Sequence, residues 1–237
     1  MDSATLAGVH HPTPARPLLG MTVLAVEDSR FACETLRRMC LRSGARLRRA
    51  DCLQSARRHL TVYRPTIVLV DLGLPDGNGA ELIADLARAT PRAAAILAMS
   101  GDTFWEDVAI AAGADGFMTK PVASLAEFQN TILRYLPRTM RPYGMRPVVD
   151  ETIASDPLAY RDDLAHASDL LHGTQDGRTL GYVAQFLSGV ARAAGDDGLA
   201  SAAASLTAAL RGGDTHDGLA QRLSALVDTR LQDRIAI

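Results

Sequence analysis

Apolar and polar positions alternate with two different periods along the first part of the chain. Short runs of aliphatic and β-branched residues predict strands at 22–26, 66–70, 95–99 and 116–118, and a weaker pattern predicts one at 46–50. Between these runs, apolar residues recur every three or four positions, which predicts helices over 29–43, 53–62, 79–90, 103–112 and 124–136. Because apolar strands alternate with helices, we expect an α/β fold, a doubly wound five-stranded parallel sheet with helices on both faces.

Polar residues and glycines mark the ends of several of these helices. Ser29 and Thr103 are expected to be helix N-caps, because a hydroxyl oxygen can accept a bond from a free N–H of the first turn. Gly44 and Gly113 are expected at helix ends, where a left-handed backbone is common.

The pattern changes after residue 137. Residues 138–150 hold two prolines, a glycine and three arginines, which is typical of a linker. From residue 151 strand signals end and helical periodicity remains, so we expect an all-α bundle of about four short helices. The predicted divisions are a disordered tail (1–19), an α/β domain (20–137), a linker (138–150) and a helical output or dimerisation domain (151–237).

Reactive side chains follow four of the predicted strands. Glu27 and Asp28 follow the first, Asp71 the third, Ser100 the fourth and Lys120 the fifth. Ligands of open parallel sheets bind at this edge. Three neighbouring carboxylates repel one another unless a cation compensates them, and Mg²⁺ is the common cation for oxygen ligands. Asp71 can then accept a phosphoryl group, while the ammonium and the hydroxyl bind phosphoryl oxygens.

Lys120 is the only lysine in a chain that otherwise uses arginine for positive charge. The use of lysine at this one position indicates a site that needs a compact ammonium rather than a planar guanidinium.

These residues resemble the receiver family of bacterial response regulators. The matching segments are Glu27-Asp28, Val-Asp-Leu-Gly-Leu-Pro-Asp-Gly-Asn-Gly around Asp71, Ala-Met-Ser-Gly around Ser100, and Phe-Met-Thr-Lys-Pro ending at Pro121. The resemblance covers residues 20–137. Two positions depart from the commoner pattern, since Glu27 stands for Asp and Ser100 for Thr.

The resemblance implies a function. It identifies Asp71 as the acceptor of a phosphoryl group from a sensor histidine kinase or a histidine phosphotransfer protein. It implies that Glu27, Asp28, Asp71 and the backbone carbonyl of Gly73 bind Mg²⁺. Such a protein is cytoplasmic and catalyses only its own phosphoryl transfer and dephosphorylation, so it is not otherwise an enzyme.

Two further features follow from the resemblance. Phe117 is the aromatic switch that swings inward as Ser100 moves, although a plain packing role is its alternative. The Lys120-Pro121 peptide bond is expected to be cis.

The C-terminal part carries less information. Residues 151–237 hold seven arginines and twelve acidic residues, a net charge of -5, so we expect no DNA binding. No apolar run is long enough for a membrane span. We therefore expect output through a downstream protein or a homodimer. The alternative is a phosphorelay component whose bundle is a degenerate or active histidine phosphotransfer-like domain, with His166 or His172 as the phosphate carrier, although neither is followed by the usual motif.

Two other side-chain groups have two interpretations each. Cys33, Cys40 and Cys52 lack metal-ligand spacing and are interpreted as small apolar residues in a reducing compartment. An arginine cluster is either a solvated face or a docking face for an acidic partner. Its members are Arg37, Arg38, Arg42, Arg46, Arg48, Arg49, Arg57 and Arg58.

Overall fold

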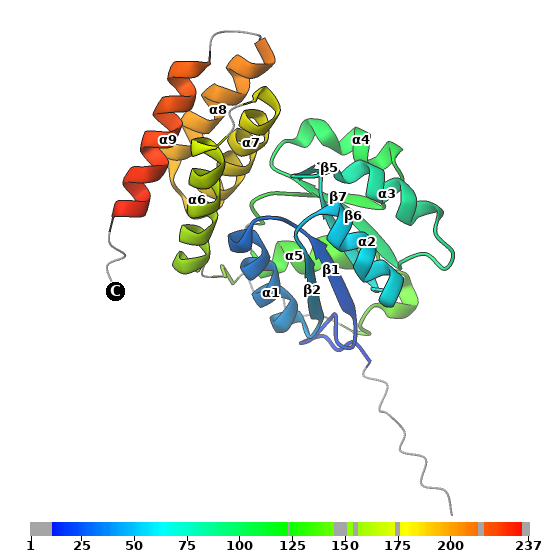
Figure 1. The fold of residues 1–237 in the computed structure, drawn as a ribbon. Helices are drawn as coiled ribbons and strands as arrows, with labels where there is room; N and C mark the ends of the chain where they lie inside the picture. The colour runs from blue at the N-terminus through cyan, green and yellow to red at the C-terminus, as the bar shows by residue number, and fades with distance from the viewer. Residues whose placement is uncertain are drawn as a thin grey trace, which may run out of the picture.

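A parallel sheet wrapped by helices is followed along the chain by a bundle of helices (Figure 1). The computed structural model describes residues 11–122, 124–144, 151–153, 156–173, 176–212 and 216–233. We call the first part, residues 18–140, the α/β unit and the second part, residues 157–232, the helical bundle. Both parts of the expected fold class are confirmed.

The sheet has five parallel strands in the order β2-β1-β3-β6-β7. The strands are β1 (Thr22–Val26), β2 (Arg46–Ala50), β3 (Ile67–Asp71), β6 (Ala95–Ser100) and β7 (Gly116–Thr119). A small antiparallel hairpin, β4 (Gly73–Leu74) with β5 (Gly77–Asn78), was not predicted. The strand order reverses between β1 and β3, and ligands of such sheets bind at that point.

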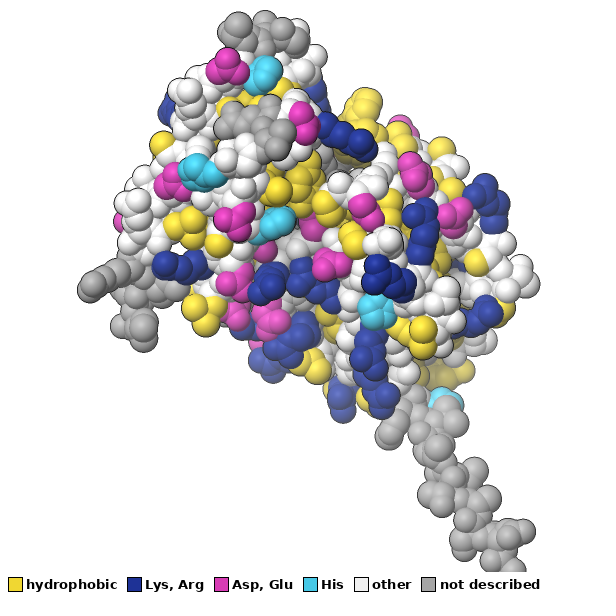
Figure 2. Space-filling view, in the orientation of Figure 1, with side chains coloured by type: hydrophobic (Ala, Val, Ile, Leu, Met, Phe, Trp, Pro, Cys, Tyr) yellow, Lys and Arg dark blue, Asp and Glu magenta, His cyan; other side chains and the backbone are white. Residues whose placement is uncertain are grey.

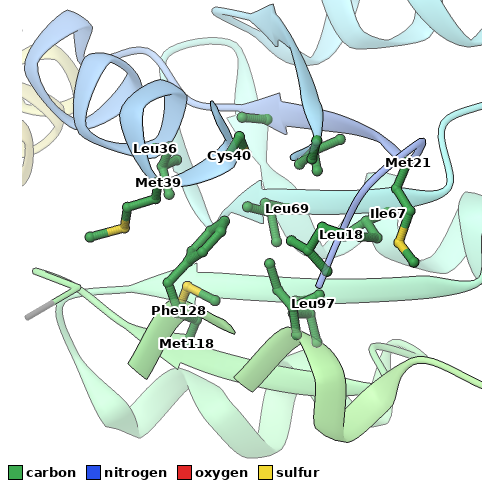
Figure 3. Packing of buried hydrophobic residues seen from close by; sticks show 14 of the residues in the cluster. Leu18, Met21, Leu36, Met39, Cys40, Ile67, Leu69, Leu97, Met118 and Phe128 are labelled. Atoms are coloured by element: carbon green, nitrogen blue, oxygen red, sulfur yellow. The ribbon is translucent and has the colours of Figure 1, made fainter. Parts of the chain in front are cut away.

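Helices cover both faces of this sheet, as predicted. They are α1 (Arg30–Ser43), α2 (Leu53–Val62), α3 (Gly79–Arg88), α4 (Glu106–Ala111) and α5 (Leu125–Tyr135), with the short 3₁₀ helices η1 (Thr103–Trp105) and η2 (Arg138–Met140). Each sheet face packs its own apolar cluster. Figure 3 shows the cluster on the side of α1 and α5, where the Phe128 ring points toward the strand residue Leu69.

Three of the four expected helix-end residues lie where they were predicted. Ser29 caps α1 by accepting from the Ala32 N–H, and Gly44 follows it with a φ of 88°. Gly113, with a φ of 104°, lies just after α4. The prediction for Thr103 is wrong by one residue, because the Asp102 carboxylate accepts from the Phe104 N–H and so caps η1.

Residues on either side of the predicted α/β domain pack onto it. Residues 1–10 and 145–150 lie outside the described part, so the predicted tail and linker are only partly visible. The predicted tail is too long, because Leu18 is fully buried and its N–H donates to the Ser43 carbonyl. Ile153 belongs to the same apolar cluster as Leu18, so the chain returns to the α/β unit before the bundle begins. Leu18 and Leu19 follow a proline-rich segment that has no periodicity to reveal the burial of Leu18.

The helical bundle has a separate core. It consists of the predicted four helices, α6 (Pro157–His172), α7 (Gly177–Ala194), α8 (Asp197–Gly212) and α9 (Asp217–Gln232). Their inward leucines, valines and alanines form one apolar cluster. No helix in the described part of the chain is long and apolar enough to cross a membrane. Cys33 and Cys40 are buried with free thiols, in agreement with an apolar packing role.

The bundle lies against helix α1 of the α/β unit through α6 and α7 (Figure 1). Acidic and basic side chains gather on the face where the two parts meet (Figure 2). Among the described residues, four ion pairs join the α/β unit to the C-terminal part: Arg30 with Asp162, Arg38 with Asp156, Arg42 with Glu151, and Asp102 with Arg211. Two of these arginines belong to the predicted cluster, so the acidic partner of that part of the cluster is this chain itself.

Candidate functional site

The predicted carboxylates form one cluster at the carboxyl edge of the sheet. One oxygen from each of Glu27, Asp28 and Asp71 lies within 4.8 Å of the others. Glu27 and Asp71 are buried. The Lys120 Nζ lies 2.9 Å from Glu27 Oε2 and 2.9 Å from Asp71 Oδ2, so the ammonium bridges two of the three acids. The expectation that these four residues lie together at one edge agrees with the structure, and their chemical roles stay predictions.

The site holds more negative charge than one ammonium balances. Burial raises the pKa of Glu27 to about 8, with Lys120 opposing the rise and the other two acids adding to it. Burial also raises the pKa of Asp28, and the charge of Asp71 adds to this effect. Burial by itself would lower the pKa of Lys120, but the neighbouring carboxylates outweigh it and the pKa is raised. A cluster of carboxylate oxygens with unbalanced charge fits a hard divalent cation.

Of three other predicted residues, Ser100 and Gly73 lie beside this cluster, while Phe117 packs elsewhere on the sheet. Ser100 is buried at the end of β6, and its Oγ accepts from the Asp102 N–H at 3.2 Å. The Gly73 N–H donates to Asp71 Oδ1 at 3.3 Å, so the loop after β3 folds back over the acid. Phe117 is half-buried on β7 against the apolar cluster next to α4. The Lys120-Pro121 bond is cis, as expected.

A cavity of about 630 Å³ opens over the cluster, between the α/β unit and the bundle. Asp71, Ser100 and Lys120 line it on one side, while Phe186 of α7 and Thr207 of α8 line it on the other. The bundle therefore forms one wall of the candidate site.

Helix α7 contacts three of the loops that follow strands. The Tyr182 hydroxyl donates to Asp28 Oδ2 at 2.7 Å, after β1. The Gln185 amide lies directly against Gly73, after β3, so a side chain at position 73 would displace it. The Arg192 Nη1 donates to the Gly101 carbonyl at 3.2 Å, after β6. Positions 182, 185 and 192 fall within about 80° of one another around the helix, so one helix face makes all three contacts.

A second contact anchors the bundle to the start of α1. Asp163 of α6 is buried, and its carboxylate accepts from Ser29 Oγ at 2.6 Å, the Arg30 N–H at 2.8 Å and the Phe31 N–H at 3.1 Å. Sequence reasoning missed both this residue and Tyr182. A signal existed for Asp163, because it lies four and eight residues before Ala167 and Leu171 on the apolar stripe of α6. No sequence signal distinguishes Tyr182.

The sequence of residues 23–132 matches the model of the response regulator receiver domain. This segment is a response regulator receiver domain. No family model matches the helical bundle. Receiver domains are regulatory modules of two-component systems, which agrees with the expectation of a response regulator.

Two curated relatives carry the same likeness. The chain is 30% identical over 139 residues to the KDP operon transcriptional regulatory protein KdpE of Escherichia coli K12, covering 59% of this chain and 61% of that protein. It is 34% identical over 103 residues to the transcriptional regulatory protein PhoP of Escherichia coli O157:H7, covering 43% and 46%. The chain therefore spans about half the length of these relatives. Both relatives are named as transcriptional regulators. The expectation that this chain binds no DNA is therefore not supported by these relatives.

Two solved structures are similar to part of this chain. A putative response regulator from Chloroflexus aurantiacus is 23% identical with a TM-score of 0.46, covering 48% of this chain and 96% of that one. The chemotaxis response regulator CheY4 of Vibrio cholerae is 21% identical with a TM-score of 0.45, covering 49% and 98%.

Proposed function

We propose that the receiver domain accepts a phosphoryl group on Asp71 from a phosphohistidine of a sensor histidine kinase or a histidine phosphotransfer protein. One observation carries the proposal: the Lys120 ammonium and two further carboxylates surround the Asp71 carboxylate. An Asp71 oxygen attacks the phosphorus, the P–N bond breaks, and the donor imidazole nitrogen keeps the electron pair. The product is an acyl phosphate.

The neighbouring residues divide the task of charge stabilisation. Glu27, Asp28, Asp71 and the Gly73 carbonyl would hold Mg²⁺, which when bound supplies positive charge beside the phosphoryl oxygens. Lys120, which bridges two carboxylates at 2.9 Å, would pair with one phosphoryl oxygen. The Ser100 hydroxyl would donate to another.

The output of this switch would pass through the helical bundle. Phosphorylation would draw Ser100 toward the phosphoryl group on Asp71, and the Phe117 ring would then turn inward. The phosphorylated state would thereby favour this conformation of the receiver domain over the unphosphorylated one. The bundle has its own core and forms a wall of the site, so it is placed to respond. We propose that it then binds a downstream protein or a second copy of this chain.

Light scattering tests the output. The molar mass of the full chain is measured with Mg²⁺ alone and then with beryllofluoride, which imitates a phosphoryl group on Asp71. A changed mass supports controlled self-association, and an unchanged mass excludes it and leaves the downstream protein.

A phosphorelay component is the second candidate function, and one observation favours it. His166 and His172 are both exposed on α6 of a four-helix bundle. The His172 Nδ1 lies 2.9 Å from the Ser168 carbonyl, and its Nε2 lies 3.5 Å from Asp228 Oδ2. A base-stable phosphoryl label on either histidine would support this candidate, because acyl phosphates break in base.

Intact mass spectrometry tests the phospho-acceptor. The full chain is incubated with phosphoramidate and Mg²⁺, and we expect the gain of one phosphoryl group, abolished by Asp71→Asn and by chelation of the metal. Asp76→Asn is the matched control, because Asp76 lies in the same loop but accepts from the Leu53 and Gln54 N–H groups. A base-labile label that persists in Asp71→Asn would contradict the assignment.

A further inference from the structure

The bundle reaches into the acidic cluster with one polar atom. The Tyr182 hydroxyl donates to Asp28 Oδ2 at 2.7 Å, and the Ser29 N–H donates to Asp28 Oδ1 at 2.9 Å. The two donors approach different oxygens, so the Asp28 carboxylate is held in one orientation. Each carboxylate oxygen has two lone pairs, so both oxygens keep capacity for a cation.

Tyr182 is itself fixed by its surroundings. Its ring lies 6.0 Å from that of Phe186, which is buried in the bundle core. Helix α7 is fixed along the loops by Arg192 at Gly101. The bundle as a whole is fixed at the start of α1 by the three bonds to Asp163. The hydroxyl therefore meets Asp28 only when the bundle is docked on the receiver domain.

We infer that Tyr182, which belongs to the helical bundle, is a positioning residue for the acidic site and orients Asp28 for the divalent cation. Because this contact forms only in the docked arrangement, it couples cation binding to bundle docking. This inference rests on the proposed function. The hydrogen bond holds one Asp28 oxygen, while one oxygen on each of Glu27 and Asp71 lies within 4.8 Å in the same cluster. Hydrogen-bond partners of metal ligands typically change metal affinity by about 10- to 100-fold.

Coupling of this kind acts in both directions. If docking strengthens cation binding by a given factor, the cation strengthens docking by the same factor. The contact thus links events at Asp71 to the position of the bundle through Tyr182 and Asp28, which lie 154 residues apart in sequence.

The experiment is a Mg²⁺ titration of the full chain, followed by fluorescence of Trp105, the single tryptophan, which lines the cavity. Tyr182→Phe removes only the hydroxyl, and we expect the Mg²⁺ dissociation constant to rise by about tenfold. Tyr160→Phe is the matched control. Its hydroxyl donates to Asp196 within the bundle at 3.1 Å, and its ring packs 5.7 Å from that of Phe31 at the same junction.

Three results would overturn the inference. One is a Tyr182→Phe variant that binds Mg²⁺ within about twofold of the wild type. Another is an equal loss in Tyr160→Phe, because the effect would then come from general loosening of the bundle. The third is a wild type that binds no Mg²⁺, which would remove the proposed function as well and is thereby distinguishable from the first two.

Amide hydrogen exchange reports bundle docking directly and depends neither on a measured Mg²⁺ affinity nor on phosphorylation. The Arg30 and Phe31 amides donate to Asp163 only in the docked arrangement, so their protection reports docking. Saturating Mg²⁺ should raise this protection by about tenfold in the wild type and in Tyr160→Phe, and leave it unchanged in Tyr182→Phe. A Mg²⁺-induced rise in Tyr182→Phe that equals the wild type would contradict coupling through this hydroxyl.

Discussion

Asp163→Asn is the most direct perturbation of the contact between bundle and receiver domain. Asp163 belongs to α6, is 2% exposed, and provides the only carboxylate among the described residues that accepts from the first N–H groups of α1. The first turn of α1 contains no acidic residue of its own. An anion at this position satisfies free donors and interacts favourably with the positive end of the helix dipole.

The structure sets the size of the effect. Asp163 Oδ2 accepts from both Ser29 Oγ and the Phe31 N–H, while Oδ1 accepts from the Arg30 N–H. Asparagine has nearly the same shape but keeps one acceptor oxygen, and its NH₂ group would face a donor. The loss of one or two bonds to a charged acceptor costs about 2–3 kcal/mol. We therefore expect docking to weaken by about 30- to 150-fold, since 1.36 kcal/mol is a factor of ten.

Two measurements follow the change. Exchange of the Arg30 and Phe31 amides, resolved by NMR, gives the magnitude. Acrylamide quenching of Trp105 gives a reporter that is distant from the substitution, because undocking opens the cavity that this residue lines. Asp162→Asn is the matched control: Asp162 is adjacent in sequence and pairs with the Arg30 guanidinium at 2.9 Å, but both side chains are more than half exposed. Such a pair contributes about 0–1 kcal/mol.

The reasoning is refuted if Asp163→Asn exchanges within about threefold of Asp162→Asn and leaves Trp105 quenching unchanged. That result would mean that apolar contacts between α1, α6 and α7, rather than the buried carboxylate, determine docking.

Three further predictions concern stability and chemistry. Leu206→Ala, at a fully buried position of the bundle, should lower the free energy of unfolding of the bundle by about 2–5 kcal/mol, measured by urea unfolding and circular dichroism. If the two domains unfold separately, the urea midpoint of the Trp105 fluorescence transition should stay unchanged. Hydrogen bonds from Arg230 hold the pKa of Asp196 at about 2, below its ordinary 3.8. The pair therefore stabilises the bundle fully above about pH 4. As the pH falls towards 2, the free energy of unfolding should drop by about 1–2 kcal/mol, a figure reduced for solvent screening. The wild-type minus Asp196→Asn difference in unfolding free energy, measured across that range, should shrink accordingly, and a constant difference would contradict the assignment. Lys120→Arg keeps the charge but replaces a compact ammonium, 18% exposed, with a planar guanidinium. Phosphorylation by phosphoramidate should therefore slow by on the order of tenfold. An unchanged rate would show that the positive charge alone suffices.

Several features of the receiver domain could be predicted from the sequence because they depend on local pattern. The strands β1 and β2 and helix α2 have the bounds that the sequence pattern predicts, although the pattern of β2 is the weakest of the five strands. Parallel strands bring their carboxyl ends to one edge, so the order of Glu27, Asp71 and Lys120 along the chain was enough to place them together. The hairpin of β4 with β5 was missed, because two-residue strands have too few positions to show a period.

The sequence by itself determined the α/β class, the four helices of the bundle and the membership of the acidic site, since each follows from periodicity and from the topology of a parallel sheet. Only the tertiary structure decided that the bundle closes over that site. Docking depends on single contacts between residues far apart in the chain, such as Asp163 with Ser29 and Tyr182 with Asp28. Such contacts have no period and no fixed spacing, so the physical information that selects them exists only once both folded surfaces are present.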